Sequence, residues 1–205
     1  MLKRTIFISA GHHLKDPGAS GNNLIERDEV IKIRDLLVPL LEEYFYVYVV
    51  PDHLKLQETV KYINGLARNL NDGLAIDLHM NAGGGSGAEC FYYDYSWRGK
   101  GMAKKLLDKY CECTKLNNRK VKGDRYSASR YLHFIKSTNP WALLLELCFI
   151  DNKEDATYFR NNREQVAQGV FEGILNIYNI KEKAEIKKKI IQNLTNSLKL
   201  VDQLC

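Results

Sequence analysis

The 205-residue sequence lacks several features that mark particular classes of protein. It has five cysteines, an odd number, and no Cys-x-x-Cys pair, which argues against a disulfide framework and a zinc ribbon. No stretch of the sequence approaches the roughly 18 apolar residues that a transmembrane helix needs. The apolar stretch near the N-terminus is too short for the core of a signal peptide. We therefore expect a protein made in a reducing cytoplasm, with no transmembrane segment and no signal peptide.

The body of the chain also lacks blocks of Lys and Arg interleaved with aromatic residues, so we expect no nucleic-acid partner. No internal repeat or low-complexity segment occurs. The net charge of +5 is modest, and it suits either an anionic surface such as a cell-wall polymer or simple solubility. With 45% hydrophobic and 27% charged residues, the composition predicts one compact domain with a substantial core.

Apolar periodicity predicts strands that alternate with helices. Alternating or continuous apolar residues predict strands at 4–9, 44–50, 74–79, 88–93, 131–135 and 142–150. Helical spacing occurs at 24–43, 56–70, 101–116, 154–160 and 163–178. This alternation predicts an α/β fold in a single domain, with a mixed, mostly parallel, twisted sheet flanked by helices.

The C-terminal segment 181–205 differs from the predicted domain 1–180. It holds six lysines against three acidic residues, and an apolar stripe follows one side of a helix. The stripe has alternating spacings of three and four residues, and its members are Ile191, Leu194, Leu198, Val201 and Cys205. A helix this short is marginal alone. We therefore expect a basic amphipathic helix that packs on the domain, joins copies into a homo-oligomer, or lies on an anionic surface.

Four residues combine into a possible hydrolytic site. His12, His79 and Glu146 lie at or near the ends of predicted strands, where functional groups gather in open α/β sheets, and Glu26 opens a predicted helix. Two of these residues have ordinary structural explanations. His12 is explained as a hydrogen-bonded loop residue, and Glu26 as an acidic residue that caps the start of a helix. Glu146 is harder to explain, because a carboxylate in an apolar strand is costly unless it is paired with an arginine, protonated or near a metal. Catalytic zinc needs about three protein ligands, an open position for water and a nearby carboxylate.

Four segments of the chain, in this order, resemble one known family. They read ISAGHHLKDPGASGNNLIERDEV, AIDLHMNA, GAECFYY and ALLLELCFIDNKED. They are similar to the signature segments of zinc-dependent N-acetylmuramoyl-L-alanine amidases of the third amidase type, which form the catalytic domains of endolysins and autolysins. The resemblance spans roughly residues 4–178.

The resemblance implies a fold, a cofactor and a reaction. The family's fold is a mixed six-stranded sheet with helices on both faces. Its Zn²⁺ ligands fall on His12, Glu26 and His79, and its catalytic glutamate on Glu146. The reaction is hydrolysis of the amide that joins N-acetylmuramic acid to L-alanine in peptidoglycan. Without a signal peptide, such an enzyme suits a phage endolysin, or less well a bacterial lysin, that reaches the cell wall after release from the cytoplasm.

Two other functions remain open from the sequence. One is a different zinc amide hydrolase, such as a carboxypeptidase or a deacetylase, on a similar scaffold. The other is a catalytically silent module that binds the cell wall, although the presence of all four site residues argues against it.

Three departures from the family pattern raise alternatives at the site. His13 stands where the family usually has glycine, so it is a rival ligand or a supporting donor for His12. Glu29 is a rival to Glu26, but Glu26 matches the family's Glu-x-Asp step. Cys148 replaces a glycine and is either a stray metal ligand or small core filling, of which we favour the second.

Three further polar residues complete the expectations. Asn81 follows His79 closely, and we assign it a substrate-binding role. His53 and His133 match no pattern, so we expect them to be structural or exposed.

Overall fold

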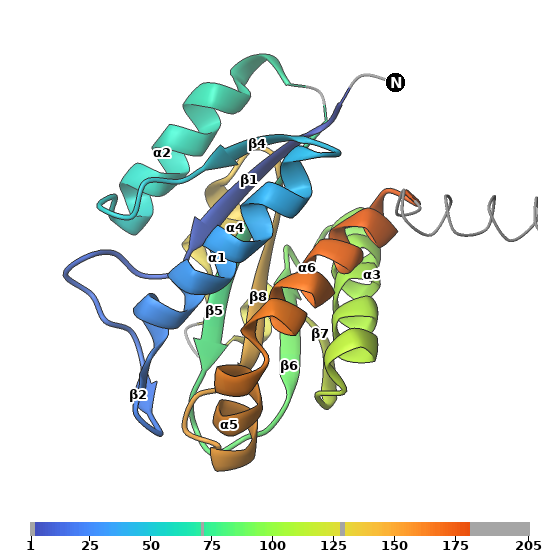
Figure 1. Ribbon diagram of the computed structural model, residues 1–205. Coiled ribbons are helices and arrows are strands. Elements are labelled where there is room, and N and C mark those ends of the chain that lie inside the picture. Colours follow the sequence, from blue (N-terminus) through green and yellow to red (C-terminus); the bar gives the residue numbers. More distant parts are fainter. Residues whose placement is uncertain (1–2, 71, 128–129, 181–205) are drawn as a thin grey trace, which may run out of the picture.

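The computed structural model describes residues 3–70, 72–127 and 130–180 (Figure 1). The strands are β1 (Thr5–Ala10), β2 (Ser20–Gly21), β3 (Leu24–Ile25), β4 (Tyr46–Val49), β5 (Gly73–Asn81), β6 (Ala88–Tyr92), β7 (Asn118–Gly123) and β8 (Trp141–Phe149). The α-helices are α1 (Glu26–Glu42), α2 (Leu56–Leu66), α3 (Trp97–Thr114), α4 (His133–Ser137), α5 (Lys153–Asn161) and α6 (Arg163–Ile177). Two 3₁₀ turns, Ala67–Asn69 and Asp124–Tyr126, complete the described elements.

Six of the strands form one sheet in the order β4-β1-β5-β8-β6-β7, and β2 pairs with β3 in a separate hairpin. Every neighbouring pair in the large sheet is parallel except β6 and β8, which are antiparallel. The predicted α/β domain with a mixed, mostly parallel six-stranded sheet is therefore confirmed. Because β1, β5 and β8 run in the same direction, their carboxyl ends lie at one edge of the sheet, which is where ligand sites form in this class of fold.

Helices cover the two faces of the sheet unequally. Figure 1 shows α1, α6 and α3 side by side across one face, where they bury the larger apolar core around residues such as Leu37, Leu106 and Ile174. On the other face, α2 and α4 cover a smaller apolar cluster that includes Ile63 and Phe134. The shorter cover on this second face leaves room for a pocket next to the carboxyl ends of the strands.

One predicted strand is wrong, and three observed strands were not predicted: the short hairpin strands β2 and β3, and β7 in the large sheet. Residues 131–135 were expected to form a strand, but α4 begins at His133, and the adjacent side chains of Phe134 and Ile135 both pack into the smaller cluster. The sixth strand is β7, an edge strand that pairs only with β6. Most of its side chains stay partly exposed, so the strand carries no apolar alternation in its sequence.

The predicted helix at 181–205 lies outside the described residues and stays a prediction. Among the helices that the structure describes, none is both long enough and apolar enough to cross a bilayer.

Candidate active site

Three of the predicted site residues come together at the carboxyl edge of the sheet. His12 follows β1, His79 lies in β5, and Glu26 is the first residue of α1. One possible ligand atom from each lies within 4.8 Å of the others. His12 Nε2 is 3.0 Å from Glu26 Oε2, and His79 Nδ1 is 2.9 Å from Glu26 Oε1. Two imidazoles and a carboxylate form a donor set of the kind that zinc takes.

The local backbone explains how Glu26 reaches this position. The β2–β3 hairpin turns at Asn22 and Asn23, whose φ values of 49° and 61° are the left-handed ones that a two-residue type I′ turn requires. The hairpin then leads directly into α1 at Glu26. Glu26 Oε2 accepts the Ala19 N–H at 2.8 Å, and Oε1 accepts the Met80 N–H at 2.9 Å, so the carboxylate is held by both the hairpin and β5.

The second ring nitrogen of each histidine faces an aspartate. His12 Nδ1 lies 2.9 Å from Asp16 Oδ2, and His79 Nε2 lies 3.2 Å from Asp77 Oδ2. Metal-binding histidines commonly make such a contact, because it fixes the ring orientation and makes the metal-facing nitrogen more basic. Our sequence interpretation gave neither aspartate a role. The available signals were the positions of Asp16, four residues after His12, and of Asp77, two residues before His79 on the same strand face.

The loop between β1 and the hairpin closes tightly over the three donor groups. His12 itself has a φ of 72°, in the left-handed region that few residues other than glycine adopt. Gly18 has a φ of +68°, and a Cβ there would lie 2.5 Å from His12 Nε2 and 2.6 Å from Glu26 Oε2. A Cβ on Gly11 would likewise collide with the ring of His79. Glycine at both positions lets the backbone approach the donor groups this closely.

The electrostatics of the cluster favour charged partners. Burial opposes the ionised form of Glu26, but hydrogen bonds from His12 and His79 outweigh it and hold the pKa of Glu26 well below its usual range. Burial also opposes protonation of both histidines, yet the surrounding carboxylates raise the pKa of His12, and that of His79 more strongly. The carboxylates around the two imidazoles therefore favour positive charge at the cluster, carried either by protons on the histidines or by a bound cation.

Glu146 lies on β8, directly opposite His79 in the parallel register with β5. Its Oε2 atom is buried and has no hydrogen-bond partner among the described residues, and no arginine there forms an ion pair with it. Burial raises the pKa of Glu146 to about 7, although the charge of His79 opposes the shift. A carboxyl group that titrates near neutral pH can accept a proton in one step and return it in the next.

Glu89 of β6 flanks Glu146 on the other side, again in direct register. Its buried carboxylate is paired with Arg119 at 2.9 Å and Lys122 at 2.6 Å, both from β7. Glu89 also accepts a 2.9 Å hydrogen bond from Asn81 Nδ2. The side chain of Asn81, to which we assigned substrate binding, thus reaches across β8 to a residue of β6.

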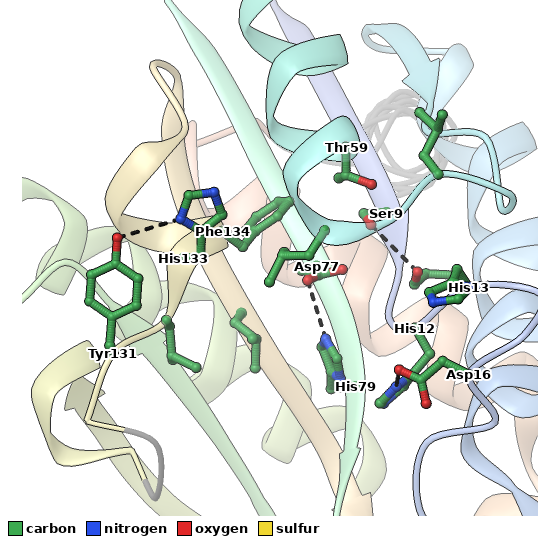
Figure 2. Close-up of a pocket in the computed structure, with 15 residues that line it drawn as sticks. Ser9, His12, His13, Asp16, Thr59, Asp77, His79, Tyr131, His133 and Phe134 are labelled. Carbon is green, nitrogen blue, oxygen red and sulfur yellow. Dashed lines mark hydrogen bonds and ion pairs between the residues drawn. The ribbon is translucent and has the colours of Figure 1, made fainter.

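The cluster faces a pocket of about 440 Å³. Figure 2 shows His12 and Asp16 on one side of this pocket and Tyr131 and His133 on the other. The His133 ring stacks on Tyr131 with centroids 6.1 Å apart, and its Nδ1 is 3.1 Å from the hydroxyl of Ser137. His133 thus lies in the pocket wall, a position that no sequence pattern indicated. His53 is exposed, as expected.

A family model described as N-acetylmuramoyl-L-alanine amidase matches residues 6–176. The chain belongs to this amidase family. The amidase is 31% identical over 193 residues to the endolysin of Bacillus phage SPP1, covering 89% of this chain and 69% of the relative. It is 29% identical over 195 residues to the N-acetylmuramoyl-L-alanine amidase CwlM of Bacillus licheniformis, covering 90% and 73% of the two chains.

Solved structures agree with the family assignment. The catalytic domain of CwlV, an N-acetylmuramoyl-L-alanine amidase from Bacillus (Paenibacillus) polymyxa var. colistinus, superposes on the amidase with a TM-score of 0.73. The two are 26% identical, and the match covers 87% of this chain and 99% of that one. The resemblance and the amidase activity expected from the sequence are thereby confirmed.

The two rival ligands lie outside the cluster of the amidase. His13 Nδ1 accepts a hydrogen bond from the Lys15 backbone N–H at 3.2 Å. Glu29 is buried between helices, where it pairs with Arg163 at 2.6 Å and with Lys32 at 2.8 Å. Glu29 therefore joins α1 to α6 instead of facing the pocket.

Cys148 faces away from the pocket because the strand register changes beside it. His79 pairs with Glu146, but Asn81 pairs with Phe149, so β8 carries one more residue than β5 between the two pairs. Such a β-bulge breaks the alternation of side chains along the strand. Alternation alone would put Cys148 on the face of Glu146, but it is fully buried in the larger core on the opposite face, as core filling requires.

Proposed function

We propose that the amidase binds Zn²⁺ through His12, Glu26 and His79, and that Glu146 moves the protons of the hydrolysis. The pair of aspartates behind the two histidines carries this proposal, since it is the arrangement that orients imidazoles for a metal. The three donor groups suit zinc, and three protein ligands leave a coordination position for water or substrate.

The bond broken is the amide between the lactyl group of N-acetylmuramic acid and L-alanine. When bound, zinc supplies Lewis-acid chemistry that polarises the scissile carbonyl and makes water more acidic. Glu146 accepts a proton from the attacking water through its unpartnered Oε2. The protonated Glu146 then donates to the L-alanine nitrogen as the C–N bond breaks, so one side chain serves both proton transfers.

The substrate we propose is the intact cell wall, degraded by a phage endolysin or a bacterial lysin after release from the cytoplasm. The similarity to the SPP1 endolysin supports this role. Purified cell walls should lose turbidity with the zinc-loaded protein, stop doing so with a chelator, and resume when zinc is restored. New L-alanine amino termini should appear without new reducing sugar ends. Release of D-alanine or of free acetate would instead identify a carboxypeptidase or a deacetylase.

For residues 181–205 we propose, from the sequence alone, a basic amphipathic helix that packs on the domain or joins copies of the chain. Light scattering on the full chain and on residues 1–180 tests this. Equal numbers of copies per particle in both would rule out association through the tail.

A further inference from the structure

A second pocket, of about 180 Å³, lies near the start of β8, where residues of α4 and of the start of α3 also line it. Strand β8 contributes Leu144 to the first pocket and Ala142 to the second, and both side chains belong to the smaller apolar cluster. Helix α4 lies between the pockets, since His133 lines the first and Lys136 lines the second. Residues two apart on a strand share a face, so the two pockets follow one another along β8.

An exposed aromatic side chain lines this second pocket. Tyr93 is 38% exposed, and its ring is tilted against that of Tyr95, with the centroids 5.6 Å apart. Trp141 is also among the residues at this pocket, but its ring packs against the larger apolar core, with the Arg98 guanidinium 5.0 Å from the ring centroid. The electron-rich faces of such rings attract the C–H groups on the apolar face of a pyranose ring.

A buried hydroxyl also lines this pocket without a partner. Thr138 is only 8% exposed, and its Oγ1 has no hydrogen-bond partner among the described residues. Leaving such a group unpaired costs free energy, which a polar ligand atom would recover. Ser96 Oγ accepts the Gly99 N–H at 2.9 Å and keeps its own proton for donation. Lys136 is the one charged residue among those that line the pocket, so the pocket suits a neutral ligand rich in hydroxyl groups.

We propose that the second pocket binds a sugar ring of the peptidoglycan glycan strand, while the metal-binding cluster cleaves a stem peptide attached elsewhere on that strand. This subsite rests on the proposed function. Ala142 precedes Glu146 by four strand residues, or about 13 Å, a distance that a few linked sugar rings span. Most ligand sites have a volume of at least roughly 300 Å³. The second pocket has about 180 Å³, and this smaller volume suits a single sugar ring. A stem peptide carries carboxylates, for which the lining offers only Lys136.

Kinetics on two substrates test the subsite in the zinc-loaded enzyme. Tyr93→Ala removes the aromatic ring from the lining, and Thr138→Val removes the hydroxyl while keeping the shape of the side chain. Tyr46→Ala is the matched control. Tyr46 is 58% exposed on the edge strand β4, which β1 and β5 separate from β8 and the second pocket. On long uncrosslinked strands, Tyr93→Ala and Thr138→Val should raise KM, Tyr93→Ala by about tenfold, with kcat unchanged. On a single N-acetylmuramoyl peptide, all three variants should match the wild type.

Calorimetric titration tests binding without turnover. Peptide-free β-1,4-linked N-acetylglucosamine oligomers should bind the wild type and Tyr46→Ala, and lose affinity for Tyr93→Ala and Thr138→Val. Equal binding by all four proteins, with unfolding midpoints unchanged, would overturn the subsite. If Tyr93→Ala and Thr138→Val raised KM on the single N-acetylmuramoyl peptide as much as on long strands, the glycan subsite would also be overturned. The pocket would then bind the peptide. If the wild type hydrolyses neither substrate, the proposed function fails, and the titration still decides whether the pocket binds glycan.

Discussion

His79 and Glu146 stand directly opposite each other on the parallel strands β5 and β8. A proposed metal ligand and the proposed proton carrier are thus paired across two adjacent strands, which lie about 4.8 Å apart. Loop movements have little influence on this spacing. The sheet itself therefore sets the relation between the proposed metal-binding cluster (His12, Glu26 and His79) and the carboxyl group of Glu146.

Replacement of this carboxyl group should separate metal binding from catalysis. Glu146→Gln keeps the size of the side chain but cannot accept a proton, so we expect turnover of cell walls to fall by about 10²–10⁴-fold. The zinc content, measured by atomic emission, should equal that of the wild type. A variant that keeps near-normal turnover would remove Glu146 from the proton transfers.

The same substitution should change how the stability of the metal-free protein depends on pH. Burial raises the pKa of Glu146 from 4.5 to about 7, so between these values the folded state retains a proton that the unfolded chain has lost. Stability from this group is therefore fully present below pH 4.5 and is lost as the pH rises toward 7, by about 3 kcal/mol in all.

Glu146→Gln should accordingly be more stable than the wild type at pH 8, by up to about 3 kcal/mol, and equally stable at pH 4. Urea unfolding in the presence of a chelator measures both. Glu164→Gln, at an exposed position in α6, is the control and should show no comparable gain at pH 8. A constant difference between Glu146→Gln and wild type across the pH range would contradict the raised pKa.

The aspartates behind the histidines should control metal affinity. Asp16→Asn and Asp77→Asn each weaken a contact that orients one imidazole, so we expect zinc affinity to fall by about 10–100-fold. Competition with a chromophoric chelator measures this. Asp28→Asn is the control, because Asp28 pairs with its neighbour Arg27 and not with a histidine. Unchanged affinity in both test variants would mean that the rings are oriented by other contacts.

Gly18→Ala should damage the metal-binding cluster without unfolding the protein. The added methyl group would collide with His12 and Glu26, and the positive φ adds backbone strain. We expect loss of bound zinc and of activity with an unchanged far-UV circular dichroism spectrum. Gly65→Ala is the matched control: in α2 its Cβ would meet nothing within 4 Å, so it should stabilise the protein by about 0.5–1 kcal/mol. Full zinc binding by Gly18→Ala would show that the loop can relax.

Strands with apolar sequences could be predicted from the sequence, and a strand with a polar sequence could not. Strand β8 is an almost continuous apolar run because it lies in the middle of the sheet, and its predicted range of 142–150 differs from Trp141–Phe149 by one residue at each end. Strand β7 has the polar sequence Asn-Arg-Lys-Val-Lys-Gly, and only its pairing with β6 makes it a strand. Residues 131–135 have strand-like composition, but packing of two adjacent side chains on the sheet favours one helical turn instead.

In the candidate site, too, some residues could be predicted from the sequence and others could not. His12, Glu26, His79 and Glu146 could be selected because they recur in a family pattern, and the structure brings the first three together. Asp16 and Asp77 act through the histidines, and such contacts across a loop or along a strand have no signature in a single sequence. The ion pair of Glu29 with Arg163 is equally invisible, because it joins residues 134 positions apart.

The extra residue in β8 has a consequence for how this scaffold can evolve. It keeps a thiol and a carboxyl group, two positions apart in the chain, on opposite sides of the sheet. Insertion of one residue into β5 between His79 and Asn81 would restore strict alternation along β8 and turn Cys148 to the face of Glu146. A site built on nitrogen and oxygen donors could then gain a sulfur donor. The extra residue in β8 thus keeps the thiol of Cys148 away from the nitrogen and oxygen donors of the site.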